Sequence, residues 1–322
     1  MNEHVAFLKL VHEAFNKHVL EYFSDDSQSV THYTSPNGFI SIISNQELWF
    51  GNIKNVNDIT EIDYAFRKII YPCVRKFKFQ DTTLNDRIIT LLAPLRKREF
   101  SFPYSDEIKL NKASIFVLST CLKADSTMLW ELYCKNSNKE GYSITLDKEC
   151  LVDSIISCSQ TKPKEDAKAI HYILRGKVVY DEQKQNEIVN DYLGILEYNL
   201  EKQSTDKAKQ EILNIYVQKF LIMALFMKDS DFDKEQEYRF VVVADDEALD
   251  CNTEKKPYLL FNSNNGAIVS RLVFPFEKSI IQSVNISPYI TAPQAEEFAR
   301  YFLDKNSLNS VKIIQGTPKM RR

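Results

Sequence analysis

The sequence contains little glycine, with only 7 glycines among its 322 residues. Loops that bind phosphate through backbone N–H groups need several glycines at fixed spacings. Neither G-x-G-x-x-G nor the P-loop pattern occurs in the chain. This absence argues against Rossmann dehydrogenases, protein kinases and P-loop NTPases.

The spacings typical of metal ligands and redox cysteines are also missing. The six cysteines contain no C-x-x-C pair, and neither they nor the five histidines are spaced as zinc ligands. Scattered cysteines in a chain of this length are typical of reduced, half-buried thiols in a cytosolic protein. We therefore expect no bound metal, and a metal-dependent hydrolase is the least supported class of function.

The chain lacks the signals of a secreted or membrane protein. Its N-terminus has no basic stretch followed by an apolar core, so no signal peptide is indicated. The longest apolar run, residues 220–227, is far shorter than the roughly 20 residues that span a bilayer. We expect a cytoplasmic protein without membrane contact. The formal net charge of -3 argues against a protein that coats nucleic acid, although it leaves room for a local basic groove.

Hydrophobic residues make up 44% of the chain, which is enough for a sizeable core. Alternating or short apolar runs predict strands over residues 30–34, 48–51, 114–120, 141–146, 177–180, 238–243 and 311–314, with short ones near 259, 268 and 284. Three- and four-residue spacings predict helices over residues 3–23, 39–45, 59–74, 88–95, 128–133 and 292–304. A helical pair is predicted over residues 182–228, with a break at 203–206, and residues 35–38 are predicted to form a turn.

These elements predict an α+β fold. No linker or internal repeat divides the chain, so we expect a single elaborated domain over residues 1–322. An N-terminal helix covers about residues 1–24, and the helical pair at about 182–228 is read as an insertion that offers a surface to a partner protein.

Two polar segments are the first candidates for a functional site. His32 lies in a short predicted strand, where a lone histidine is more often a core or edge residue than a ligand. Glu235 and Glu237 lie just before the predicted strand 238–243. Residues two apart on a strand face the same side, so both carboxylates could point into one cleft. Two close carboxylates raise one pKa, which suits proton transfer or cation stabilisation, and Arg239 could neutralise them. The alternative is a charged start of a strand at the surface.

Aromatic residues accompany both polar segments. Trp49 follows the first segment, and Trp130 and Tyr133 share a predicted helical turn. Core packing explains most aromatics at such positions. A pocket that holds a flat ring uses the same residue types, because stacking gives large contact area.

The order of several motifs resembles a bacterial family catalogued as domain of unknown function 2971. The motifs are His32-Tyr33-Thr34-Ser35 with Gly38, Leu48-Trp49-Phe50, Asn57-Asp58-x-x-Glu61, Leu118-Ser119-Thr120-Cys121, Trp130-x-x-Tyr133, Gly141-Tyr142-Ser143-Ile144, Val178-Val179-Tyr180, and Lys228 with Glu235-x-Glu237-Tyr238-Arg239. The likeness spans about residues 30–290. That family is similar to the ADP-ribosyltransferase-like superfamily, which implies a split β-sheet core that binds NAD in a central cleft.

The resemblance also implies roles for individual residues. His32 would bind the nicotinamide-side ribose, and Glu237 would hold its 2′-hydroxyl and stabilise the oxocarbenium-like state as nicotinamide leaves. Glu235 is the alternative for that acid, or it would orient the acceptor. The remaining NAD-binding candidates are Tyr33, Thr34, Trp49, Ser119, Trp130, Tyr133, Lys228 and Arg239. A fixed carboxylate near a developing cation is the main requirement of such chemistry.

The activity implied is ADP-ribosyl transfer from NAD to a protein or nucleic acid, by a toxin or an anti-phage defence effector. An NAD glycohydrolase is a close variant of this reading. A non-catalytic module that senses a nucleotide or a phage component is the alternative from another class. The chain departs from one transferase class, because the Ser-Thr-Ser motif of that class is absent.

Overall fold

The structure is a computed structural model that describes residues 19–55, 59–97, 101–103, 110–134, 138–160, 170–245, 249–252, 257–264 and 266–316. The chain forms two compact units. Unit 1 comprises residues 1–25, 56–114 and 175–233, and unit 2 comprises residues 26–55, 115–174 and 234–322. Two boundaries fall inside the strands β4 (Leu110–Cys121) and β6 (Ile170–Lys177). This interleaving explains why the sequence shows no linker.

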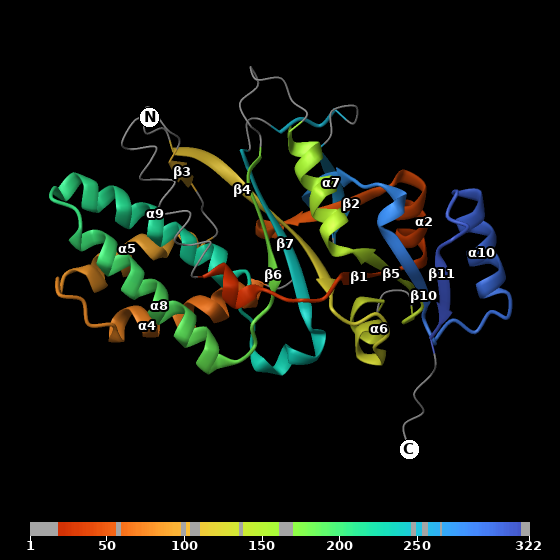
Figure 1. Ribbon diagram of the computed structural model, residues 1–322, viewed down its shortest axis with the longest axis horizontal. Helices are drawn as coiled ribbons and strands as arrows, with labels where there is room; N and C mark the ends of the chain where they lie inside the picture. Colours follow the sequence, from red (N-terminus) through yellow and green to blue (C-terminus); the bar gives the residue numbers. More distant parts are fainter. Residues whose placement is uncertain are drawn as a thin grey trace. The chain divides into compact units, whose positions relative to one another are not determined.

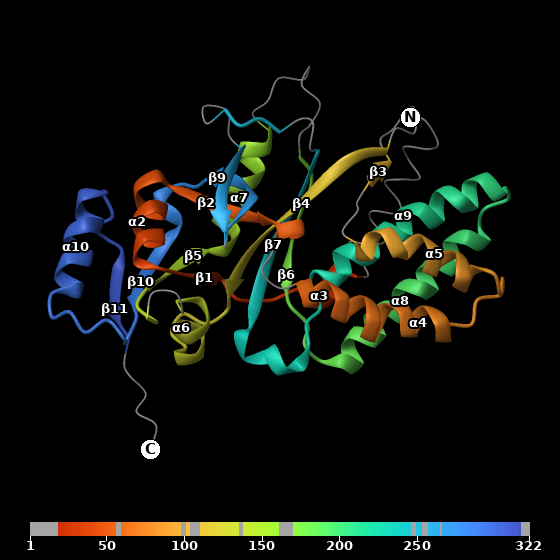
Figure 2. The same ribbon diagram turned by 180° about the vertical axis from the view of Figure 1, so that it is seen from behind.

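Unit 1 is mainly helical. Its helices are η1 (Leu20–Phe23), α3 (Ile59–Tyr64), the π-helical η3 (Ala65–Ile70), α4 (Tyr71–Lys76), α5 (Leu84–Arg96), α8 (Glu182–Glu201) and α9 (Asp206–Ala224). The short strand β3 (Ser101–Pro103) pairs with the start of β4. Figures 1 and 2 both show α8 and α9 side by side, with α4 and α5 packed against them.

The predicted helical pair is confirmed as α8 and α9. Asp181 caps α8 and Thr205 caps α9, each accepting a hydrogen bond from the backbone N–H three residues ahead. Such caps satisfy N–H groups that have no partner inside the helix. The break that the sequence predicts at 203–206 is therefore the cap of the second helix.

Unit 2 is built on a large sheet. Its strands are β1 (Ser29–Thr34), β2 (Glu47–Asn52), the end of β4, β5 (Tyr142–Asp147), the start of β6, β7 (Glu237–Asp245), β8 (Tyr258–Asn264), β9 (Ala267–Pro275), β10 (Ile281–Ile286) and β11 (Lys312–Gln315). The strand order is β11-β10-β5-β1-β4-β2-β9-β8, and β7 pairs with β4 and β6. Its helices are α2 (Pro36–Asn45), α6 (Thr127–Tyr133), α7 (Lys148–Gln160) and α10 (Ala295–Lys305), with short 3-10 turns η2 (Ile53–Asn55) and η6 (Lys278–Ile280). The 3-10 helix η5 (Ser230–Glu235) leads into β7.

The sheet forks along one edge of β4. Cys121, at the end of β4, pairs with Thr31 of β1, whereas Val117 pairs with Gly51 of β2. From these points, one branch continues as β1-β5-β10-β11 and the other as β2-β9-β8. Ser119 lies between the two branches, so its backbone faces the fork. The opposite edge of β4 carries β7.

The first face of the sheet packs against α2, α7 and α10 and forms the main hydrophobic core. Each strand contributes alternate residues to this core, such as Val30 in β1, Phe50 in β2 and Phe240 in β7. Figure 2 shows α10 beside β11 at the end of the sheet. Because the intervening residues point the other way, residues 31, 33, 49, 51, 237 and 239 belong to the second face.

The second face is more polar. Asn285 of β10 donates to Ser143 of β5 at 3.1 Å, and the hydroxyl groups of Thr31 and Thr145 lie 3.3 Å apart. These four side chains are all buried. The Ser143 hydroxyl also donates to the carbonyl of Ala124, in the loop before α6. Buried polar groups are therefore satisfied by one another and by that loop.

Most predicted strands and helices are confirmed, and the exceptions have local causes. Residues 35–38, predicted as a turn, form the cap and first turn of α2, because Ser35 accepts from the N–H of Gly38 and Pro36 suits the first helical position. The strand predicted at 177–180 is wrong beyond Lys177: β6 ends there and Val179 makes an isolated bridge to Met227. Helix α7 was not predicted. Most of the helix predicted over residues 3–23 lies outside the described residues.

The predicted thiols are free cysteines. Four of them, Cys73, Cys121, Cys134 and Cys158, are buried, whereas Cys150 and Cys251 are exposed. Among the helices that the structure describes, none combines the length and the apolar character needed to cross a membrane.

Candidate functional site

A buried ion pair lies at the start of β7. Arg239 donates from Nη2 to Oε2 of Glu237 at 2.6 Å, and the two residues are only 5% and 3% exposed. Both belong to the second face of the sheet, because they are two residues apart on one strand. A carboxylate removed from water in this way keeps its charge only if a partner and hydrogen bonds compensate the lost hydration. Glu237 is therefore a negative charge held at a fixed position.

Glu235 lies near this pair, but it is carried by a different element from the strand that the sequence predicts. It is the last residue of η5 rather than part of the strand, and Gln236 between the two acids has a left-handed φ of 44°. The carbonyl of Gln236 accepts from the N–H of Leu122, just after β4. The prediction of simple strand alternation is wrong here, although Glu235 is buried like Glu237.

Tyr133 of α6 joins the two acids. Burial raises the pKa of its hydroxyl well above the ordinary value of 10, and the charges of Glu237 and Glu235 add to the effect while Arg239 opposes it. The phenol therefore lies within electrostatic range of both carboxylates, and 37% of the residue remains exposed. We name Tyr133, Glu235, Glu237 and Arg239 the acid–tyrosine cluster.

Two further aromatic residues support Tyr133 from behind. The ring of Tyr33 stacks on Tyr133 with centroids 6.1 Å apart, and Trp130 meets Tyr33 edge-on at 4.7 Å. The Tyr33 hydroxyl donates to the carbonyl of Lys123 and accepts from the N–H of Ser126. Because Trp130 is fully buried, its ring is a support for Tyr33 rather than an open stacking surface.

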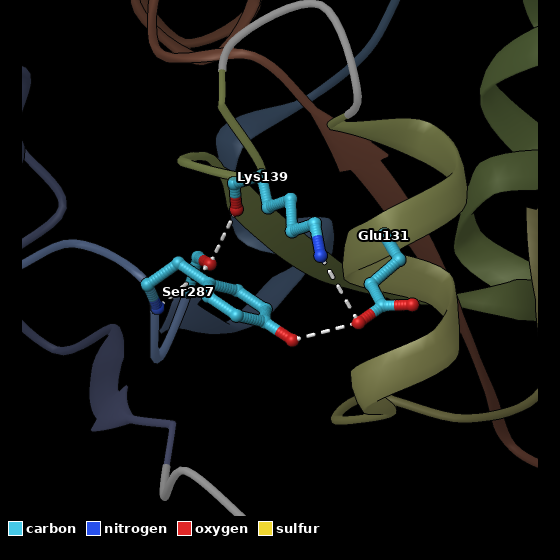
Figure 3. A network of polar contacts seen from close by, with 4 residues as sticks. Glu131, Lys139 and Ser287 are labelled. Carbon is cyan, nitrogen blue, oxygen red and sulfur yellow. Dashed lines mark hydrogen bonds and ion pairs between the residues drawn. The ribbon is translucent and has the colours of Figure 1, made fainter.

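A polar network holds α6 against the end of the sheet (Figure 3). Glu131 accepts from Nζ of Lys139 at 3.2 Å and from the hydroxyl of Tyr289 at 3.0 Å. The hydroxyl of Ser287, which follows β10, donates to the carbonyl of Lys139 at 2.7 Å. The network ties α6 to the loops around β5 and β10, and so fixes the helix that carries Tyr133. No local sequence pattern indicates this network, because its members are 148 and 158 residues apart.

His32 lies at the fork of the sheet, on the other side of β4 from Glu237. Its Nδ1 is 3.4 Å from the carbonyl oxygen of Ser119, which can only accept, so this nitrogen carries the proton. The imidazole thus donates to the Ser119 carbonyl of β4, which lies between the residues that pair with β1 and those that pair with β2. The backbones of β1 and β7 are separated by two strand spacings, roughly 10 Å. Among the described residues, no side-chain hydrogen bond or ion pair joins His32 to Glu237.

Burial lowers the pKa of His32 below 6.5, because the half-buried imidazole is disfavoured as a cation. The unfolded chain therefore takes up a proton near pH 6.5 that the folded protein does not. We expect the free energy of unfolding to fall as the pH drops below 6.5. In His32→Asn, whose amide can still donate to Ser119, denaturant titrations at pH 7.5 and 5.5 should differ less than in the wild type. Equal losses in both proteins would contradict the assignment.

The remaining predicted ligand residues lie at separate places. Trp49 is on the second face of β2 and is 40% exposed, Thr34 ends β1, and Ser119 faces the fork through its backbone. Lys228 belongs to unit 1, where its Nζ lies 2.7 Å from Oε1 of Glu61 and 4.8 Å from the ring centroid of Phe232. The partner of Lys228 is therefore the acid of the Asn57-Asp58-x-x-Glu61 motif, which sequence analysis did not connect with it.

No group of three or more His, Cys, Asp or Glu side chains within the described part of the chain has the geometry of a metal site. The acid–tyrosine cluster combines a fixed carboxylate, a second buried acid, a guanidinium group and a phenol at the boundary with solvent. Such a set can stabilise a developing cation and accept a proton.

Comparison with known proteins matches residues 129–240 to the model of a family described as protein of unknown function (DUF2971). The matched segment begins in α6 and ends in β7, so it contains all four residues of the acid–tyrosine cluster. No curated protein and no solved structure matches the chain. The match covers about a third of the chain, and over this segment the chain is similar to the DUF2971 family.

Proposed function

We propose that this protein is an ADP-ribosyltransferase-like enzyme that uses NAD as its substrate. The observation that carries the proposal is the buried carboxylate of Glu237, fixed by Arg239 and within electrostatic range of Tyr133. The forked sheet adds no support for a shared pocket, because strand alternation puts His32 on the first face with Val30, whereas Glu237 lies on the second face.

The proposed reaction breaks the glycosidic bond between ribose C1′ and the nicotinamide nitrogen. The bonding electron pair leaves with nicotinamide, and a positive charge develops on the ribose. Glu237 stabilises this charge, since a fixed carboxylate in a water-poor site stabilises it more strongly than water does. An acceptor nucleophile then bonds to C1′ and loses its proton, for which Glu235 is the nearby base. The products are ADP-ribosylated acceptor, nicotinamide and a proton.

Arg239 and Tyr133 act on Glu237 in this scheme. Arg239 pairs with the acid and orients it, and Tyr133 lies within electrostatic range of it. The ribose-binding role that the resemblance implies for His32 would need its Nε2, because Nδ1 already donates to Ser119, and it would act from the first face of the sheet. Trp49, which is exposed, remains the candidate for stacking on a ring.

The test is to incubate the purified protein with labelled NAD, with and without extract of bacterial cells. We expect nicotinamide release in both cases and label transfer to a macromolecule in the extract. Nicotinamide release without transfer would identify a glycohydrolase instead. Saturable NAD binding by calorimetry without any product would overturn the enzymatic proposal in favour of a binding module. Growth arrest of cells expressing the protein is expected if it is a toxin or defence effector.

A further inference from the structure

The β2-β9-β8 branch of unit 2 carries a second group of polar and aromatic residues on the second face of the sheet. Arg271 of β9 pairs with Gly51 of β2 on one side and with Leu260 of β8 on the other. Trp49 is two residues from Gly51 on β2, and Asn262 is two residues from Leu260 on β8. Both side chains therefore lie on the same face as Arg271. We name Trp49, Gly51, Asn262 and Arg271 the Arg271 platform.

Arg271 is a half-buried cation without an acidic partner among the described residues. Burial lowers the pKa of its guanidinium group, and no carboxylate of the residues that the structure describes opposes the effect. The side chain lies over Gly51, where an added Cβ would be 2.5 Å from Nη1. Glycine at position 51 thus leaves the space that the guanidinium group occupies. A planar guanidinium group held in this way is suited to a phosphate group.

Asn262 supplies an acceptor on the same face. Its Oδ1 is buried and has no hydrogen-bond partner within the described part of the chain. An unsatisfied buried carbonyl oxygen is costly, and in native proteins it calls for a partner outside the chain's own hydrogen bonds. A ligand that reaches this oxygen must offer an N–H or O–H group.

Trp49 supplies a flat surface beside the cation. It pairs with Val273, the residue two positions from Arg271, and it is 40% exposed. Diagonal neighbours on a sheet remain within reach of large side chains. An exposed indole next to an arginine is the combination that binds a nucleobase and its phosphate, since stacking accepts any base.

We propose that the Arg271 platform binds a phosphate-bearing nucleotide. Arg271 contacts the phosphate, Trp49 stacks on the base, and Asn262 accepts from an amino or hydroxyl group of the ligand. The nucleotide is either a free one or a unit of single-stranded nucleic acid, because both present the same three groups. The formal net charge of -3 agrees with a local contact rather than binding by bulk charge.

The experiment measures binding to the full chain without NAD. ADP is titrated by calorimetry, and a labelled single-stranded oligonucleotide of about ten nucleotides, within the usual span of such sites, is titrated by fluorescence anisotropy. We expect saturable binding of at least one probe. Arg271→Ala and Trp49→Ala should each weaken it about tenfold, the loss typical of one phosphate or stacking contact.

Two further variants keep the proposal falsifiable. Gly51→Ala should displace the Arg271 guanidinium group at little cost to folding, because its new methyl group meets only the end of a flexible side chain first. It is expected to weaken binding as Arg271→Ala does. Lys312→Ala is the matched control, since it removes one positive charge from an exposed position on β11, at the other end of the strand order.

Binding that distinguishes the platform variants from Lys312→Ala supports the proposal, and the stronger probe identifies a free nucleotide or nucleic acid. Failure of both probes to bind, or equal losses in Arg271→Ala and Lys312→Ala, overturns it. Trp49 is shared with the proposed NAD site, whereas Arg271 and Gly51 are not, so Arg271→Ala and Gly51→Ala test the platform separately from NAD cleavage. Thermal unfolding of each variant confirms that it is folded.

Discussion

Glu237→Gln is expected to reduce nicotinamide release from NAD by at least about a hundredfold, the usual cost of removing one preorganised electrostatic group. The amide keeps the shape of the side chain and can still accept from Arg239. It cannot supply the negative charge that the proposed oxocarbenium-like state needs. The measurement is single-turnover nicotinamide release at saturating NAD, so that binding and chemistry are separated.

Glu235→Gln is the matched control for this change. Both acids are buried and act electrostatically on Tyr133, and Glu237 accepts from Arg239 at 2.6 Å. We expect Glu235→Gln to slow label transfer to an acceptor more than nicotinamide release, because its proposed role is to take a proton from the acceptor. Equal nicotinamide release in Glu237→Gln and the wild type would refute the assignment of Glu237, whichever way Glu235→Gln behaves.

Much of the fold could be predicted from the sequence, because its signals are local. The strand at β1, the strand at β7 and the helical pair α8 and α9 each carry a strong periodic pattern and identifiable ends. The sequence also pointed to Glu237, Tyr133 and Tyr33, which the structure brings together. The order of the motifs in the sequence indicated these residues.

The remainder could not be predicted, because it depends on pairing between distant segments. Nothing in the local sequence indicates that β4 pairs with both β1 and β2 along one edge, so the fork and the place of His32 within it were inaccessible. The left-handed Gln236 breaks the alternation between the two acids without a glycine or asparagine to signal it. Arg271 attracted no attention, because its significance depends on Gly51 lying 220 positions earlier on a paired strand.

Arg239→Met is expected to destabilise the folded protein by about 3–5 kcal/mol, the range measured when one member of a buried ion pair is removed. Methionine fills much of the volume of arginine, so the loss is electrostatic rather than a cavity effect. Glu237 would remain 3% exposed without this partner. The free energy of unfolding is obtained from urea titrations at neutral pH, and a change below about 1 kcal/mol would contradict a paired, buried charge.

The double variant Glu237→Gln, Arg239→Met separates the pair from its surroundings. Because the two groups are in direct contact, their effects should not add, and the double variant should be more stable than the sum of the single losses predicts. An ordinary exposed ion pair would show a coupling of at most about 1 kcal/mol. A coupling of several kcal/mol would show that the charges are desolvated together. Glu237 would then be held by an interaction that also fixes its orientation, which is the property that the proposed glycosidic cleavage requires of it.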